Sequence, residues 1–345
     1  MSNSTLQRSA AAPSSARAPS ATLSNLLANY GLLFVFLLIM LVFGLLRPSS
    51  FFSATNFNSI LVSQSVTAIL ALAAMVPLAT KQFDLSIGYH LGMAQVLIVG
   101  LQVTQGLGWP LAAALILLAS LLVGFVNGLL VTFFRIDSFI ATMGTGTLLY
   151  GVTNWYTNGE QIPGMSLPDS FTGLTQIVHG VPLPAIYVAI IAAILWVVTE
   201  RLPIGRNLYV IGANVRAAEL TGINVRRHVI GAFIVAGLLS SFAGLVLGSI
   251  LQTGTPSVGP EYLLPAFAGG LLGATSIKPG RVNVIGTLLS VLVLAFSFSG
   301  VQQLGAPFYV QFFFNGAILI VAVGLSVYAA RRRQRAATAT KPGVS

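Results

Sequence analysis

The segment RLPIGRNLYVIGANVRAAELTGINVRRH, from Arg201 to His228, is a polar island in an otherwise apolar chain. Long apolar runs flank it on both sides, and it carries five arginines: Arg201, Arg206, Arg216, Arg226 and Arg227. A basic, polar segment between apolar runs is typical of a loop that stays on one side of a bilayer. The side on which this loop lies therefore determines the topology of all the helices around it.

The composition around this loop is that of a membrane protein. Of 345 residues, 55% are hydrophobic and only 7% are charged, against about 25% charged in soluble domains. We therefore expect an all-α, polytopic membrane protein in contact with lipid. The net charge of +10 reflects basic residues placed between and after the apolar runs, so it indicates topology and no nucleic-acid partner. The chain has no cysteine and three scattered histidines, so we expect no metal site.

Three regions follow from the distribution of residues. Residues 1–24 are rich in Ser, Ala and Pro and contain no acid, which predicts a disordered cytoplasmic tail. The apolar run that follows is longer than the 7–15 residues or so of a signal-peptide core, so it is interpreted as a retained anchor. Residues 25–330 are the expected transmembrane domain, with 199–228 as its central cytoplasmic loop, and 331–345 form a basic cytoplasmic tail.

Ten apolar segments approach the roughly 20 residues that a spanning helix needs. They lie near Leu26–Leu46, Ile60–Thr80, Leu85–Val103, Leu111–Phe134, Phe139–Tyr156, Leu183–Val198, Val229–Leu251, Leu263–Ser276, Val282–Gly300 and Tyr309–Ala330. The eighth is short and rich in glycine. The second and third are candidates for broken or re-entrant helices, which are tolerated where the backbone is buried or lines a cavity. Glycines inside the segments, such as Gly124 and Gly128, predict close helix packing.

The basic residues fix the orientation. With a cytoplasmic N-terminus and ten spans, sixteen of the seventeen Lys and Arg residues lie on the cytoplasmic side, and only Arg47 lies outside. A count of nine or eleven spans would place either the central loop or the RRRQR tail on the opposite side. The positive-inside rule therefore predicts an even number of spans with both termini in the cytoplasm.

The acidic and amide residues are few and allow two interpretations each. A charge at mid-bilayer costs about 2.5–3.5 kcal/mol on insertion scales, and none of the seven acids has to lie there. Asp84 and Asp137 each precede a predicted helix, so each either caps that helix or serves transport. Asn127 lies within a span, where it either bridges helices or contacts a polar solute, because an unpaired amide would be costly there.

Known catalytic motifs are missing from the sequence. It contains no GxSxG, HExxH or phosphate-binding GxxxxGK[ST] pattern, so we expect a chain that is no enzyme and does not itself hydrolyse a nucleotide.

The middle of the central loop has the pattern of a short helix. Asn214 is a good N-cap, Val215–Thr221 contains helix-forming residues, and Gly222 suits the left-handed conformation that ends a helix. A helix of about two turns is not stable alone. It must therefore pack on its own membrane domain or dock into a partner, unless the loop is merely a topological anchor.

The same loop, Thr199–His228, resembles the cytoplasmic loop of permease subunits in bacterial ribose/xylose/arabinose/galactose-type ABC sugar importers. Three further segments agree in order and spacing: FDLSIG (Phe83–Gly88), GFVNGLLVTFFRIDSFIATMGT (Gly124–Thr145) and GPEYLLPAFAGGLLGATSIKPGRVNVIGT (Gly259–Thr287). The resemblance covers roughly Ile60 to Ala330. Its last motif departs from the family pattern at Gly273–Ser276 and Lys278–Arg281, which leaves the identity of the sugar open.

This resemblance implies a dimer of permease subunits in the bacterial inner membrane. Cytoplasmic ABC ATPase subunits would bind ATP and Mg²⁺, so this chain itself needs no cofactor, and a periplasmic sugar-binding protein would deliver the cargo for alternating access. The implied ATPase-coupling residues are Asn214, Arg216, Ala217, Ala218, Glu219, Leu220, Thr221, Gly222, Ile223 and Asn224. The candidate residues of a translocation pathway are Asp84, Ser86, Asn127, Thr142 and Thr145.

Two other classes of membrane protein are also compatible with the sequence. An ion-coupled secondary sugar carrier would act without an ATPase and would be expected to carry an intramembrane acid. A channel or a membrane scaffold would not depend on the short helix of the central loop.

Overall fold

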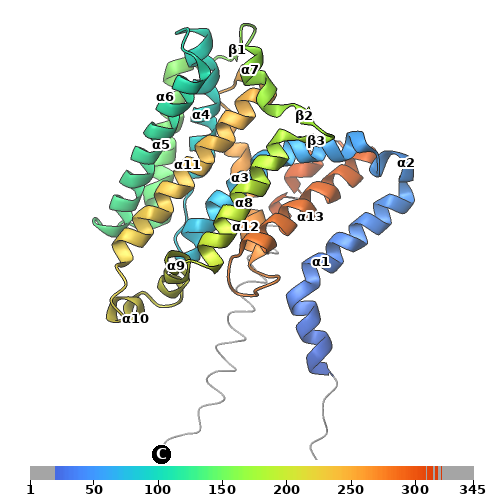
Figure 1. Cartoon of the computed structure of the whole chain (residues 1–345), viewed down its shortest axis with the longest axis vertical. Helices are drawn as coiled ribbons and strands as arrows, with labels where there is room; N and C mark the ends of the chain where they lie inside the picture. Colours follow the sequence, from blue (N-terminus) through green and yellow to red (C-terminus); the bar gives the residue numbers. More distant parts are fainter. Residues whose placement is uncertain (1–19, 308, 314, 318–319, 321–345) are drawn as a thin grey trace, which may run out of the picture.

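The structure, a computed structural model, describes residues 20–307, 309–313, 315–317 and 320, and it is a bundle of helices (Figure 1). The long helices are α1 (Ser20–Leu46), α3 (Ala54–Ala79), α4 (Ser86–Val103), α5 (Trp109–Thr132), α6 (Ser138–Thr157), α8 (Leu183–Glu200), α11 (Val225–Leu251) and α13 (Val284–Gln303). The shorter ones are α2 (Pro48–Phe51), α7 (Asp169–Thr172), α9 (Pro203–Ala213), α10 (Val215–Leu220), α12 (Leu263–Gly273) and the 3₁₀ turns η1 (Gly173–Thr175) and η2 (Gly259–Tyr262).

The predicted fold class is confirmed at the level of an all-α, polytopic membrane protein. Among the described residues, six helices are long and apolar enough to cross a bilayer: α3, α4, α5, α8, α11 and α13. Nine of the ten expected segments coincide with α1, α3, α4, α5, α6, α8, α11, α12 and α13. The tenth, Tyr309–Ala330, lies largely outside the described residues.

The second and third segments differ from their prediction, because α3 and α4 are continuous helices and not broken or re-entrant ones. Helix α3 begins at Ala54, six residues before Ile60, because the Ser53 hydroxyl accepts a hydrogen bond from the Asn56 N–H at 3.2 Å and caps it. Helix α12 is short, as expected. It ends at Gly273, whose carbonyl accepts a hydrogen bond from the Asn283 side chain at 2.9 Å.

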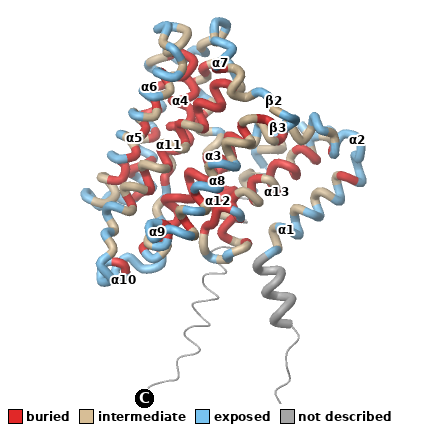
Figure 2. Tube along the Cα trace, viewed as in Figure 1, coloured by how far each residue is buried: buried red, intermediate tan, exposed pale blue. Residues whose placement is uncertain are grey.

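The core lies where α3, α4 and α11 meet, and each of these helices carries more buried residues than any other described helix (Figure 2). Ile69, Leu72 and Met75 of α3 are fully buried there. Helix α5 approaches α11 so closely that a Cβ atom at Gly124 would lie 2.6 Å from the carbonyl oxygen of Phe233. The prediction that glycines permit close helix packing is confirmed at this crossing.

The two ends of the bundle carry different elements (Figure 1). Helices α9 and α10 lie at one end, and α2, α7 and two small antiparallel ribbons lie at the other. In these ribbons β1 (Ile162–Pro163) pairs with β4 (Thr253–Gly254), and β2 (Ile177–Val178) pairs with β3 (Val181–Pro182). The segment that precedes α8 is anchored by Phe171, which is fully buried and whose carbonyl accepts a hydrogen bond from Ser249 of α11 at 2.8 Å.

Candidate functional site

Helix α10 is a short, capped helix at one end of the bundle (Figure 1). The Asn214 side chain caps it by accepting a hydrogen bond from the Ala217 N–H at 3.1 Å. Gly222 then adopts φ +81°, a left-handed conformation that suits glycine. Asn224 starts the next helix, α11, by accepting a hydrogen bond from the Arg227 N–H at 3.1 Å. The predicted cap, helix and glycine stop are confirmed.

One face of α10 is fixed to the membrane domain and the other is exposed. Ala218 is fully buried and belongs to a small apolar cluster with Val229 and Phe233 of α11. On the exposed face Arg216 and Glu219 form an ion pair at 3.3 Å. Leu220 on this helix is 78% exposed. Of the ten predicted coupling residues, Ala218 is buried, Ile223 is half-buried, and the rest are exposed: Asn214, Arg216, Ala217, Glu219, Leu220, Thr221, Gly222 and Asn224.

The loop contains a second helix, α9, which the sequence analysis missed. Its signals were present: Pro203 is at the first helical position, and Leu208, Ile211 and Gly212 share a face at helical spacing. These three residues are buried, and Gly212 lies directly against the carbonyl of Ala79 at the end of α3. The capped helix α10 therefore follows a segment that is itself packed on the bundle.

A charged cluster lies beside α9. Glu200, at the end of α8, binds both Lys278 and Arg281, the latter at 3.5 Å. Lys278 and Arg281 were predicted only as markers of topology, because no local pattern in the sequence links them to Glu200. The cluster ties the end of α8 to the segment that leads into α13.

Three of the five predicted pathway residues, Asp84, Ser86 and Asn127, form a buried hydrogen-bonded cluster, and Thr142 is hydrogen-bonded to the backbone beside it. Asp84 accepts hydrogen bonds from the N–H and the hydroxyl of Ser86, the N–H at 3.0 Å. The Asn127 side chain donates to the Ser86 hydroxyl at 2.9 Å. Thr142 accepts a hydrogen bond from the Leu85 N–H at 2.9 Å, and its carbonyl accepts one from Thr145, which is half-buried, at 3.2 Å.

The hydrogen bonds show the capping and bridging contacts of these residues, and the second oxygen of Asp84 and the amide oxygen of Asn127 make no hydrogen bond within the described part of the chain. Asp84 caps the start of α4, and Asp137 caps α6 by accepting from the Phe139 N–H at 3.0 Å. Asn127 bridges α5 to α4. Burial raises the pKa of Asp84 to about 6, although the hydrogen bonds from Ser86 act in the opposite direction. A transport role for these residues stays a prediction, and none of them lines the cavity described next.

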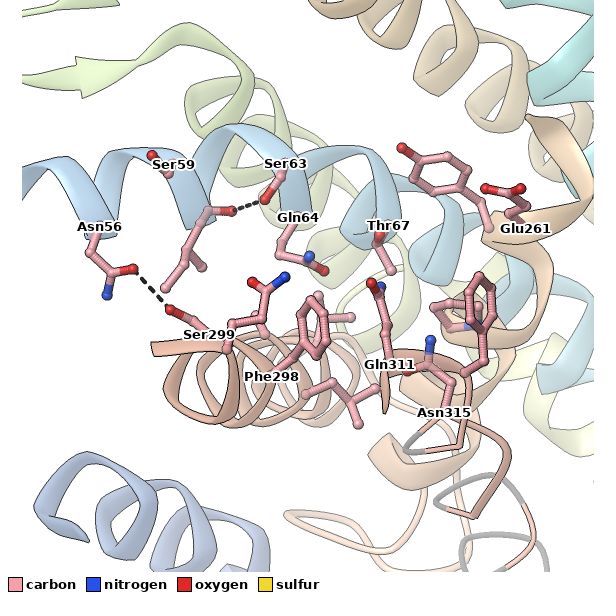
Figure 3. Close-up of a pocket in the computed structure, with 18 residues that line it drawn as sticks. Asn56, Ser59, Ser63, Gln64, Thr67, Glu261, Phe298, Ser299, Gln311 and Asn315 are labelled. Atoms are coloured by element: carbon pink, nitrogen blue, oxygen red, sulfur yellow. Dashed lines mark hydrogen bonds between the residues drawn. The ribbon is translucent and has the colours of Figure 1, made fainter. Parts of the chain in front are cut away.

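A polar cavity of about 490 Å³ lies between α3, η2, α12 and α13 (Figure 3). Amide and hydroxyl side chains share its wall. They are Asn56, Ser59, Ser63, Gln64 and Thr67 of α3, Ser299 and Gln302 of α13, and Gln311 and Asn315. Phe298 and Phe312 add aromatic surface. Neutral hydrogen-bonding groups beside aromatic rings suit a polar, uncharged ligand.

The cavity is nearly free of charge. Among the residues that line it, Glu261 is the one ionisable residue apart from Tyr262. Burial, and secondarily the charge of Glu261, raise the pKa of the Tyr262 phenol, so it stays neutral. Asn56 is fixed because it accepts a hydrogen bond from Ser299 at 2.8 Å. The Gln64 side chain, in contrast, makes no hydrogen bond within the described part of the chain, so its amide is available to a ligand.

The sequence carried a signal for this cavity. Asn56, Ser59, Ser63 and Thr67 recur at intervals of three and four residues, which places them on one face of a helix. Asn56 and Ser59 precede Ile60, where this span was predicted to begin, and the stripe consists mostly of hydroxyl groups and contains no acid, so it was not among the predicted site residues.

Comparison with known proteins gives the family. Residues 56–323 match the family described as "Branched-chain amino acid transport system / permease component". The ribose import permease protein of Bacillus subtilis (strain 168) is 34% identical over 290 residues, which covers 84% of this chain and 89% of that protein. The D-allose transport system permease protein of Escherichia coli (strain K12) is 30% identical over 299 residues, 86% of this chain and 91% of that protein. The galactose/methyl galactoside import permease protein of Haemophilus influenzae is 30% identical over 320 residues, 87% of this chain and 94% of that protein.

This chain belongs to that family of transport permease components. The resemblance drawn from its sequence motifs is confirmed, and the chain is a transporter subunit and not an enzyme. No solved structure matches it.

Proposed function

We propose that this chain is the membrane subunit of an ATP-driven importer that carries a monosaccharide, delivered by a periplasmic binding protein, by alternating access. The polar cavity between α3 and α13 is the observation that carries the proposal. A sugar offers hydroxyl groups and no charge, so amides and hydroxyls such as Gln64, Ser299 and Gln302 match it without a counter-charge. The names of the relatives point to ribose, D-allose and galactose as candidate cargoes.

The power source is proposed to be a pair of cytoplasmic ABC ATPases that bind ATP and Mg²⁺. This chain has no phosphate-binding motif of its own. Helix α10 offers the docking surface, with Leu220 at its exposed tip and Ala218 holding it to α11. A displacement of α10 would be transmitted to α11 through that buried contact, because packed side chains move together.

The proposed topology has ten spans and both termini in the cytoplasm of a bacterial inner membrane. The distribution of Lys and Arg supports it, and α9 and α10 then lie on the cytoplasmic side. A second permease copy is proposed to complete the pathway. Gly144 and Gly151, on one exposed face of α6, support this by leaving room for a neighbouring helix to approach closely.

An ion-coupled carrier is the main competing class. The relatives are permease components of transport systems, which favours the ATP-driven importer. Among the described residues, the buried carboxyl of Asp84 already serves as a helix cap, and the cavity holds a single carboxyl at Glu261.

Reconstitution tests the proposal. The chain is placed in proteoliposomes with its ATPase and binding protein, and uptake of labelled ribose, allose and galactose is measured. We expect uptake of one of these sugars only when ATP and all three components are present. Uptake by the isolated chain under an ion gradient, without the ATPase, would overturn the proposal.

A further inference from the structure

A second groove, separate from the polar cavity, lies between α8, α9 and α11. Its volume is about 490 Å³, and its walls are almost entirely apolar. Ile191 and Ile194 of α8 form one side, Ile204 of α9 closes one end, and Val235 and Leu239 of α11 form the other side. Ile194 is 56% exposed, so the groove is open to the surroundings of the bundle.

The groove has the length of one lipid leaflet. On α11 its wall includes a stripe of residues four apart, Arg227, Gly231, Val235 and Leu239, with His228 and Ala232 beside it. At 1.5 Å per residue this stripe is about 18 Å long. Half of a hydrocarbon core is about 15 Å thick. In the proposed orientation the groove therefore runs from the cytoplasmic headgroup region to the middle of the bilayer.

The cytoplasmic end of the groove is positively charged. No lining residue is acidic, and Arg227 forms no ion pair with any described residue. His228 is engaged through both ring nitrogens, Nδ1 with the Asn224 carbonyl at 2.8 Å and Nε2 with the Asn207 amide at 3.1 Å. Arg227 is thus the group at this end that is available to an anion.

We infer that this groove is a binding site for an anionic phospholipid of the cytoplasmic leaflet, with an acyl chain against α8 and α11 and its phosphate at Arg227. Basic residues at the cytoplasmic end of a pocket between transmembrane helices recognise acidic headgroups. An apolar groove of this length accommodates one acyl chain of a lipid from the surrounding bilayer. The site contains none of the residues of the polar cavity, so it is a lipid site and not part of the proposed cargo path.

Gly231 provides a sharp test. A Cβ atom there would meet nothing within 4 Å, so Gly231→Phe fills the groove without disturbing the packed helices. Ile194→Trp fills it from the opposite wall, in case the first variant fails to fold. Gly31→Phe on α1, where a Cβ would also meet nothing within 4 Å, is the matched control. Arg227→Gln removes the charge and keeps the groove.

The experiment titrates the full chain in neutral detergent with phosphatidylglycerol, phosphatidylethanolamine or glycerol phosphate, and counts bound molecules by native mass spectrometry. We expect wild type and Gly31→Phe to bind phosphatidylglycerol about fivefold more tightly than phosphatidylethanolamine, the contribution of one basic residue near an anionic headgroup. Arg227→Gln should bind both lipids alike. Gly231→Phe and Ile194→Trp should bind both about tenfold more weakly, because the acyl chain loses buried methylene contacts.

Three results would overturn the inference. Equal binding of the two lipids by wild type would remove the role of Arg227. Competition by glycerol phosphate as strong as by the lipid would indicate a phosphate site without an acyl chain. Unchanged lipid binding by both groove-filling variants would mean that a protein segment or a second copy occupies the groove.

Discussion

The guanidinium carbon of Arg281 lies 3.4 Å from the centroid of the Tyr209 ring. Tyr209 belongs to α9, and its hydroxyl donates a hydrogen bond to the carbonyl of Val282 at 3.0 Å, just before α13. Burial raises the pKa of Tyr209, so the phenol stays neutral. Its hydroxyl therefore remains a hydrogen-bond donor, and its ring face attracts the Arg281 cation. Because α9 leads into α10 and α13 forms a wall of the polar cavity, this contact joins the proposed ATPase-docking end to the proposed sugar path.

Arg281→Lys should separate charge from geometry at this contact. Lysine keeps the positive charge beside Glu200 but lacks the planar face that stacks on Tyr209. We expect the sugar transported per ATP hydrolysed to fall severalfold in proteoliposomes, with the protein still folded. Lys278→Arg, which changes the other partner of Glu200, is the control and should retain coupling. Equal loss in both variants would indicate that only the ion pair matters.

Leu220→Arg should uncouple ATP hydrolysis from transport. Leu220 is 78% exposed, so the change should cost the fold little, within about 0.5 kcal/mol. We expect the assembled complex to lose sugar-stimulated ATPase activity while the variant still inserts in the membrane. Leu304→Arg, at an apolar position that is 49% exposed at the opposite end of the bundle, should leave stimulation normal. Normal stimulation in Leu220→Arg would remove α10 from the docking surface.

Gln64→Leu should weaken transport by removing a free amide from the cavity. Binding loses about 1–3 kcal/mol of free energy when a buried hydroxyl of the ligand is left without its hydrogen-bond partner. Uptake at low sugar concentration should therefore fall about tenfold. The control is Gln102→Leu on α4, outside the cavity, whose amide donates to the Ile98 carbonyl. If the two variants transport alike, the cavity is not on the sugar path.

Asp84→Asn should change how stability depends on pH. The folded protein holds the Asp84 proton up to a pH of about 6, whereas an unfolded chain releases it near 3.8. The free energy of unfolding that comes from holding this proton is therefore fully present below pH 3.8. It is lost as the pH rises to about 6, by about 3 kcal/mol in all. We expect wild type to lose unfolding free energy over this range in detergent, and Asp84→Asn to lose much less and to be the more stable protein above pH 6. Asp137→Asn, an exposed cap near Arg135, is the control; a profile like wild type in Asp84→Asn would contradict the burial of this charge.

The local features of the central loop were predictable because they depend on adjacent residues. Asn214, Gly222 and their spacing determine where a two-turn helix begins and ends once its apolar face is packed. The same holds for Asp84 and Asp137 as caps. The apolar segments were also predictable, since the length of a spanning helix follows from the thickness of the bilayer.

The contacts between distant segments could not be predicted in the same way. Glu200 and Arg281 are 81 positions apart, and no local pattern indicates that they meet beside Tyr209. The polar cavity likewise combines hydroxyl and amide side chains of α3 with Ser299 and Gln302 of α13, each unremarkable in its own helix. Its position depends on how the helices cross, which the sequence pattern does not specify.

The most direct measurement of the central claim is the accessibility of the cavity. The chain has no cysteine, so Gln64→Cys provides a single reporter for a membrane-impermeant thiol reagent added to either side of proteoliposomes. In the complex with its ATPase and binding protein, we predict that the labelled side switches when ATP is added, and that the switch disappears in the Leu220→Arg background. Labelling from the same side with and without ATP would contradict an ATP-driven, alternating-access permease.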